Sequence, residues 1–246
     1  MKVTVSDTET TGFDHQCNSV VEIAGVDLAT GEFSHSLVKP NHPISFGAMA
    51  THMITEAMVE DALPLVLTDT HADLCVSDVI VFHNAEFDRE FARVPVDTAR
   101  YLCTYRCALH LFPDAESHRN MSLAYELGLD FSDAPDQGAA SMPHRALFDA
   151  WVTRKLLIHM LEFVSENVFT EQELLDGAVG DDDAVNYLVD LGTKPVLLPT
   201  LKFGKHSGQP CSDIPASYWF WIEGQDFDMD IKHTADHWLR QRGRRR

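Results

Sequence analysis

Residues 2–13 read KVTVSDTETTGF, so a run of β-forming residues leads directly into two acidic residues, Asp7 and Glu9. Residues two apart in a strand share one face and lie about 6.5 Å apart. Two carboxylates at that separation repel each other unless a cation lies between them. The same residues also suit a solvated strand end, because Asp and Gly are common in turns. The stretch alone therefore leaves a metal site and a plain turn open.

The apolar pattern of the chain predicts an α/β domain over residues 1–165. Further strands are predicted at 20–26, 33–38, 79–82 and 101–102, with a turn at 29–32. Helices are predicted at 55–67 with a break at Pro64, and at 70–74, 88–94, 104–111, 122–127 and 146–163. Strands that come first and then alternate with helices are typical of an α/β fold.

Charge is unevenly distributed along the 246 residues, whose formal net charge is −19. A strongly acidic chain disfavours general nucleic-acid binding, which needs a basic surface. Residues 156–193 contain nine acidic residues and no Lys or Arg, whereas residues 194–246 contain six acidic and nine basic residues. We therefore expect an acidic linker with short helices over 166–193 and a small C-terminal unit with a basic tail over 194–246.

The sequence pattern favours a cytoplasmic protein without a membrane partner. Its apolar runs are far shorter than the ~20 residues that span a bilayer. Asp7 and Glu9 interrupt the N-terminus, so it does not resemble a secretory signal. The five cysteines are scattered and odd in number, which favours reduced thiols.

Two later acidic residues are candidates to join Asp7 and Glu9. Asp88 follows the predicted strand 79–82, and Asp149 lies early in the predicted helix 146–163. Taken singly, Asp88 suits a helix N-cap and Asp149 suits charge compensation at a helix N-terminus. In open α/β sheets, however, strand ends and the neighbouring helices meet at one crevice. Four carboxylates gathered there need cations, and ligands that are all oxygen select Mg²⁺ or Mn²⁺.

Three motifs in order resemble those of the DEDD exonucleases. They are Asp-Thr-Glu-Thr-Thr-Gly at 7–12, His-Asn-Ala-Glu-Phe-Asp at 83–88 and His-Arg-Ala-Leu-Phe-Asp at 144–149. The histidine five residues before the last Asp is similar to the DEDDh branch, whereas the tyrosine branch would place Tyr at Arg145. The resemblance covers most of the chain, including Phe203-Gly204-Lys205 and Trp219. It implies a ribonuclease H-like mixed sheet with flanking helices, plus a small C-terminal accessory unit.

The resemblance implies 3′→5′ exonuclease chemistry with two metal ions, expected to be Mg²⁺ with Mn²⁺ able to substitute. Asp7 would bridge the metals, and Glu9 and Asp149 would complete the site with the scissile phosphate. Asp88 would act directly or through water. His144 would take the proton from the attacking water, a task that suits a reference pKa of about 6.5.

The resemblance also implies which residues hold the 3′ end of the substrate. Phe13 is expected to stack on the terminal base, although a phenylalanine taken alone is more commonly core. His52-Met53-Ile54-Thr55 corresponds to a family stretch that has Gly at the position of Met53. The full predicted substrate-binding set is Thr10, Gly12, Phe13, His52, Asn84 and Phe87.

The expected function is a metal-dependent exodeoxyribonuclease that acts on a free DNA 3′ end, single-stranded or duplex, and releases nucleoside monophosphates. An exoribonuclease similar to ribonuclease T or oligoribonuclease is one alternative, and a polymerase-associated proofreading subunit is another. Replication or repair proteins are the expected partners, and the oligomeric state stays open. The basic C-terminal unit is expected to hold DNA, with most of its aromatic residues in a small core.

Overall fold

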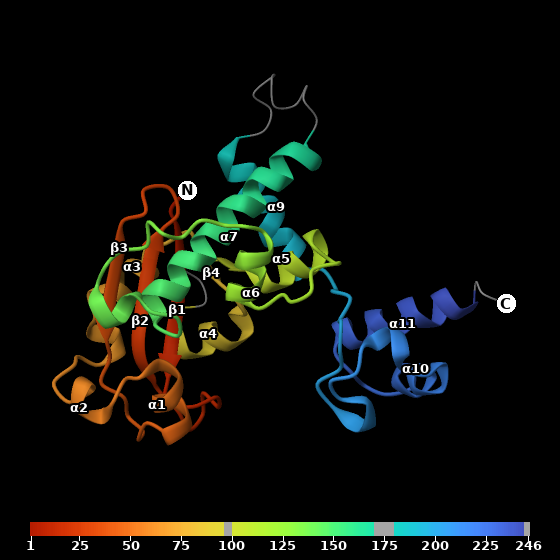
Figure 1. Ribbon diagram of the computed structural model, residues 1–246, viewed down its shortest axis with the longest axis horizontal. Helices are drawn as coiled ribbons and strands as arrows, with labels where there is room; N and C mark the ends of the chain where they lie inside the picture. Colours follow the sequence, from red (N-terminus) through yellow and green to blue (C-terminus); the bar gives the residue numbers. More distant parts are fainter. Residues whose placement is uncertain (96–99, 170–179, 244–246) are drawn as a thin grey trace. The chain divides into compact units, whose positions relative to one another are not determined.

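The computed structural model describes residues 1–95, 100–169 and 180–243 (Figure 1). The chain divides into two compact units. The first comprises Met1–Cys107 and Asp114–Gly192, and the second comprises Ala108–Pro113 and Thr193–Arg246. The predicted linker lies partly outside the described residues, so its boundaries stay predictions.

Five strands of the first unit form one mixed sheet in the order β3-β2-β1-β4-β5. They are β1 (Val3–Thr10), β2 (Val20–Asp27), β3 (Phe33–Leu37), β4 (Val79–Phe82) and β5 (Arg100–Cys103). β1 pairs antiparallel with β2 and parallel with β4, so a meander is joined to two parallel strands. The predicted α/β fold with a ribonuclease H-like mixed sheet is confirmed.

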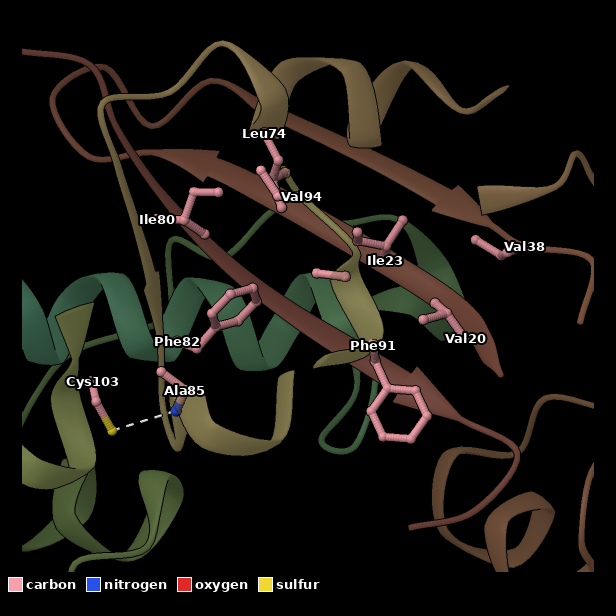
Figure 2. Close-up of a cluster of buried hydrophobic side chains, with 11 residues drawn as sticks. Val20, Ile23, Val38, Leu74, Ile80, Phe82, Ala85, Phe91, Val94 and Cys103 are labelled. Atoms are coloured by element: carbon pink, nitrogen blue, oxygen red, sulfur yellow. Dashed lines mark hydrogen bonds between the residues drawn. The ribbon is translucent and has the colours of Figure 1, made fainter. Parts of the chain in front are cut away.

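Side-chain alternation gives the sheet two different faces. On one face, α7 (Ala146–Asn167) lies across β1 and β2, where it packs on Ala24 and Val26 (Figure 1). On the other face, α3 (Asp69–Cys75) and α4 (Ala85–Ala92) cover a larger apolar cluster (Figure 2). Full burial of each large apolar side chain stabilises the fold by about 1.5–3 kcal/mol. This cluster, which includes Leu74, Ile80 and Phe82, is the main support for the strand ends.

The helices before the C-terminal unit depart from the predicted pattern in two places. The pattern did not predict α1 (Phe46–His52), whose Gly47 and Thr51 have low helix propensity. Ser45 nevertheless caps α1, because its Oγ accepts a hydrogen bond of 3.1 Å from the backbone N–H of Ala48. The predicted helix at 55–67 is not continuous, since only α2 (Glu56–Val59) and the 3-10 turn η1 (Leu65–Leu67) are helical.

The helix that carries Asp88 also begins earlier than predicted. It starts at Ala85, with Asn84 as a left-handed N-cap at φ 91°, so Asp88 lies within α4 and is not its cap. Of the four other helices, two are close to their predicted positions, the third falls in a region without a helix prediction, and the fourth lies in the linker for which short helices are predicted. They are α5 (Thr104–Leu111), α6 (Asn120–Glu126), η2 (Gly138–Ser141) and α9 (Asp181–Thr193).

The C-terminal unit has its own apolar core. It contains η3 (Gly204–His206), η4 (Cys211–Asp213), α10 (Ala216–Glu223) and α11 (Met229–Gly243). Trp219 is fully buried with Ile214 and Ile222, as expected for a core aromatic, whereas Trp221 is 47% exposed. Among the described residues, every helix is too short or too polar to cross a membrane.

Candidate active site

Three of the four predicted acidic ligands meet at the end of β1. Asp7 and Glu9 point to the same face of the sheet because they are two residues apart in β1. Asp149 reaches them from the first turn of α7, which covers that face. Each of the three residues offers a carboxylate oxygen that lies within 4.8 Å of the others. We call Asp7, Glu9 and Asp149 the three-acid group.

Burial makes the charge on this group costly. It raises the pKa of Asp7 well above the ordinary value, and the nearby Asp88, Asp149 and Glu9 add to the shift. Burial, together with the charges of Asp149 and Glu22, raises the pKa of Glu9 to about 9. The pKa of Asp149 rises to about 6, chiefly through burial and against the lowering effect of His144. The protein groups around these three carboxylates therefore do not offset the cost of their ionisation.

A divalent cation fits the group. Asp149 Oδ1 is buried and has no hydrogen-bond partner within the described part of the chain. An unpartnered carboxylate oxygen next to two further carboxylates provides the hard oxygen donors that Mg²⁺ and Mn²⁺ prefer. This is the place in the described structure where three acidic side chains converge.

Asp88 lies near the three-acid group but is not part of it. It is buried in α4, and its Oδ1 accepts a hydrogen bond of 2.7 Å from Thr8 Oγ1. Burial raises the pKa of Asp88 to about 7, although the hydrogen bonds from Thr8 oppose the shift. One carboxylate oxygen is thus engaged by the protein, which suits a contact through water better than one more direct ligand. The sequence pattern did not predict the role of Thr8.

His144 lies in the exposed turn that precedes α7. His144 lowers the pKa of Asp149, as expected for a residue in the turn that leads into α7. The backbone of His144 has φ 61°, a left-handed conformation that is uncommon for residues other than Gly. The predicted base therefore lies in the turn before the helix that carries Asp149, a member of the three-acid group.

A buried ion pair next to His144 was missed by the sequence analysis. Arg145 is 5% exposed and Glu22 is 0% exposed, and Arg145 Nε donates to both carboxylate oxygens at 3.1 and 2.9 Å. A signal for this pair was present in the sequence. Glu22 interrupts the apolar run of β2, and a charged residue within a buried strand requires a partner.

The loop after β1 presents Phe13 to solvent. Phe13 is 92% exposed, and its ring lies 6.5 Å from that of Phe87, which in turn contacts Phe91 at 4.8 Å. A Cβ atom at Gly12 would overlap the side chain of Asn18, so a larger residue here would displace that side chain. Thr10 Oγ1 donates to the carbonyl oxygen of Gly12 at 2.7 Å, which fixes the turn.

The other predicted substrate-binding residues lie at helix ends. His52 is buried at the end of α1, and its Nδ1 accepts a hydrogen bond of 3.0 Å from the backbone N–H of Ile54. Met53, which replaces the family glycine, adopts the left-handed φ of 61° that a glycine would favour. Asn84 is exposed at the start of α4.

The sheet, the three-acid group and the adjacent histidine together define an exonuclease-type site. A family model described as Exonuclease matches residues 4–157, and the chain belongs to this family. It is therefore a 3′→5′ exonuclease, a phosphodiester hydrolase of the DEDD type.

Two curated relatives show how far the similarity extends. Exodeoxyribonuclease 10 of Escherichia coli K12 is 31% identical over 244 residues, which cover 96% of this chain and 97% of that protein. The PolC-type DNA polymerase III of Bacillus cereus is 29% identical over 191 residues. That match covers 73% of this chain but 13% of the polymerase. The similarity to exodeoxyribonuclease 10 thus includes the C-terminal unit.

Solved structures support the same assignment. Exonuclease X in complex with 5′ overhanging duplex DNA matches with a TM-score of 0.59 and 32% identity, over 77% of this chain and 99% of that one. E. coli exonuclease I in complex with single-stranded DNA matches with a TM-score of 0.51 and 17% identity, and it shares the fold alone.

Proposed function

We propose that this exonuclease degrades DNA from a free 3′ end and releases nucleoside monophosphates, using two Mg²⁺ ions for which Mn²⁺ can substitute. One observation carries the proposal: the three-acid group lies on a chain that is 31% identical to an exodeoxyribonuclease over 96% of its length. The DNA complex of the similar exonuclease X supports the choice of substrate.

In the proposed mechanism, Asp7, Glu9 and Asp149 hold the metal ions, and Asp88 acts through water. Bound metal would supply charge stabilisation at the phosphate and at the leaving oxygen. His144 accepts a proton from the attacking water as the water oxygen bonds to phosphorus. The bond between phosphorus and the 3′ oxygen breaks, and the 3′ oxygen of the shortened strand takes a proton from solvent water to become a hydroxyl. The released product is a nucleoside 5′-monophosphate.

Phe13 is the proposed contact for the terminal base. An aromatic ring that is 92% exposed beside a catalytic site offers a stacking face to any base. Phe87 supports the ring from α4. Thr10, Gly12, His52 and Asn84 complete the proposed contact set. Replication or repair proteins remain the predicted partners and the cytoplasm the predicted location.

A digestion experiment tests the proposal. DNA and RNA of one sequence, single-stranded and duplex, are labelled at the 5′ or 3′ end and incubated with Mg²⁺, with Mn²⁺ and with EDTA. We expect stepwise shortening of 5′-labelled DNA and release of labelled mononucleotide from 3′-labelled DNA, with both abolished in EDTA. Faster digestion of RNA than of DNA would contradict the proposed substrate and favour the exoribonuclease alternative, because discrimination then depends on the 2′ hydroxyl.

A further inference from the structure

Glu22 is a further carboxylate that lies next to the three-acid group without belonging to it. It is paired with Glu9 across β1 and β2 and is fully buried. Arg145 Nε and Nη2, the backbone N–H of Ala146 at 2.9 Å and His35 Nε2 at 2.7 Å all contact its two oxygens. A carboxylate has about four lone-pair sites, so these donors saturate Glu22. It is therefore held away from metal binding.

The donors to Glu22 come from the segment that carries the proposed base and one proposed ligand. Arg145 directly follows His144, and Ala146 begins α7, in which Asp149 completes the first turn. Arg145 is the N-cap residue of α7 but makes no side-chain capping bond. Glu22 supplies the missing cap from β2, because it accepts the backbone N–H of Ala146. A negative charge at a helix N-terminus is favoured by the helix dipole.

The turn before α7 needs such an external restraint. His144 has φ 61°, and a residue other than Gly keeps this conformation when its surroundings fix it. Arg145 and Glu22 form a two-point contact between a planar guanidinium and a carboxylate, which fixes orientation as well as distance. His35 adds a third direction of restraint from β3.

We propose that Glu22 is a positioning residue, which acts through Arg145 and Ala146 to fix His144 and Asp149 against Asp7 and Glu9. The proposal rests on the roles proposed above for His144 and Asp149. A purely structural ion pair would hold α7 on the sheet and affect folding alone. A positioning pair also affects the chemical step, in protein that is fully folded.

Four variants separate these roles: Arg145→Lys, Arg145→Met, Glu22→Gln and the combined Glu22→Gln/Arg145→Met. Arg145→Lys keeps the charge but not the two-point contact, and the combined variant removes both charges, so no unpaired charge stays buried. The matched control is Lys155→Met, which breaks the exposed pair between Lys155 and Asp133, 2.6 Å apart, on the same helix.

Four quantities are measured for each full-length variant. They are kcat and KM on a short single-stranded DNA with saturating Mg²⁺, Mn²⁺ binding by electron paramagnetic resonance without DNA, and thermal unfolding without metal. We expect Arg145→Lys and the combined variant to lower kcat by about 100-fold, since a displacement of about 1 Å can have that effect. KM should stay within about twofold, because the residues that touch the DNA strand are unchanged. Mn²⁺ binding should weaken several-fold as Asp149 shifts. Lys155→Met should match the wild type.

Two results would overturn the proposal. One is a folded Arg145→Lys or combined variant whose kcat and Mn²⁺ affinity both equal those of the wild type. The other is a reduced kcat that returns to the wild-type value on cooling to a temperature at which the variant is fully folded, since the pair would then be structural. His144→Ala in the same assay tests the underlying assignment separately. If that variant kept wild-type turnover, the proposed base would be wrong whatever Glu22 does.

Discussion

The end of β1 and the core of the C-terminal unit use burial in opposite ways. In the C-terminal unit, buried side chains such as Trp219 and Ile222 are apolar, so burial stabilises the fold. At the end of β1, the side chains of Asp7 and Asp88 are carboxylates whose pKa values are raised by burial, so burial costs stability there. The catalytic end is therefore held in shape by its surroundings, namely the apolar cluster of Figure 2 and the donors around Glu22. Substitutions in the two regions should have opposite consequences for stability and activity.

The largest expected effect is that of Asp7→Asn. Turnover should fall by at least about 10³-fold, because metal stabilisation of the reacting charges is worth several kcal/mol and each 1.36 kcal/mol is tenfold in rate. The metal-free variant should be at least as stable as the wild type. The amide of Asn carries no charge, so it avoids both the cost of burying a carboxylate and the repulsion from the neighbouring acidic residues. Turnover with Mg²⁺ and urea unfolding with EDTA measure the two quantities. The exposed Asp114→Asn is the matched control. A tenth of wild-type turnover in Asp7→Asn would refute the metal-site assignment.

Trp219→Ala should have the opposite profile. Removal of a fully buried Trp side chain destabilises a core by about 3–5 kcal/mol, so the C-terminal unit should unfold earlier in urea. Turnover of a short oligonucleotide should stay within about twofold of wild type, because no group of the proposed mechanism is altered. The control is Phe220→Ala, since Phe220 is 63% exposed on the same helix. Loss of turnover in Trp219→Ala, but not in Phe220→Ala, would mean that the two units are coupled.

The pH dependence of stability tests the electrostatic half of the comparison. Unfolded Asp and Glu side chains titrate near pH 4, whereas burial raises the folded pKa to about 6 for Asp149, 7 for Asp88 and 9 for Glu9. The folded state then binds more protons than the unfolded state between these values, so the stability of the metal-free protein falls as pH rises from about 4 to 9. Added Mg²⁺ should remove most of the fall.

Urea unfolding at pH 5, 7 and 9, with EDTA and with Mg²⁺, measures this effect. Asp7→Asn should flatten the metal-free dependence, because one of the interacting carboxyl groups is gone. A metal-free wild type that is more stable at pH 9 than at pH 5 would contradict the assigned pKa shifts.

Features of the fold that depend on local sequence patterns were predictable, whereas those that depend on contacts between distant residues were not. Strands β1, β2 and β4 were predictable because their apolar runs report burial locally. The grouping of Asp7, Glu9 and Asp149 was predictable because these residues belong to motifs that resemble those of the DEDD exonucleases. The charged Glu22 within the apolar run of β2 indicated that a partner is needed, but no local pattern identifies Arg145, 123 residues away, as that partner. Helix α1 was missed because its stability depends on the cap by Ser45 and on packing, and not on a strong periodic pattern.

The smallest expected effect belongs to the basic side chains of the C-terminal unit, the predicted DNA-holding segment. Several of them already have protein partners: Arg240 pairs with Asp236 at 2.7 Å, and Arg242 donates to the carbonyl oxygen of Ser212 at 2.8 Å. The last three arginines of the predicted tail, residues 244–246, lie outside the described residues. Lys202 and Lys205, on either side of Phe203, are exposed, and Lys205 Nζ lies 5.4 Å from the centre of the Tyr218 ring. They are therefore the side chains to test.

Lys202→Gln/Lys205→Gln should raise KM for DNA a few-fold and leave kcat on a short oligonucleotide unchanged, because these lysines act on phosphates remote from the chemistry. The slope of log affinity against log salt is negative. For each phosphate that a lysine no longer neutralises, it should become shallower by about 0.7 on single-stranded DNA and about 0.9 on duplex. The dissociation constant of DNA, measured in EDTA at two salt concentrations, gives that slope.

Lys2→Gln/Lys39→Gln in the catalytic unit removes the same charge and controls for net charge alone. If both double variants have the same slope as the wild type, the C-terminal lysines do not hold DNA. If both slopes become shallower by the same amount, the effect is one of overall charge, because a local DNA contact would change the slope of the Lys202→Gln/Lys205→Gln variant alone.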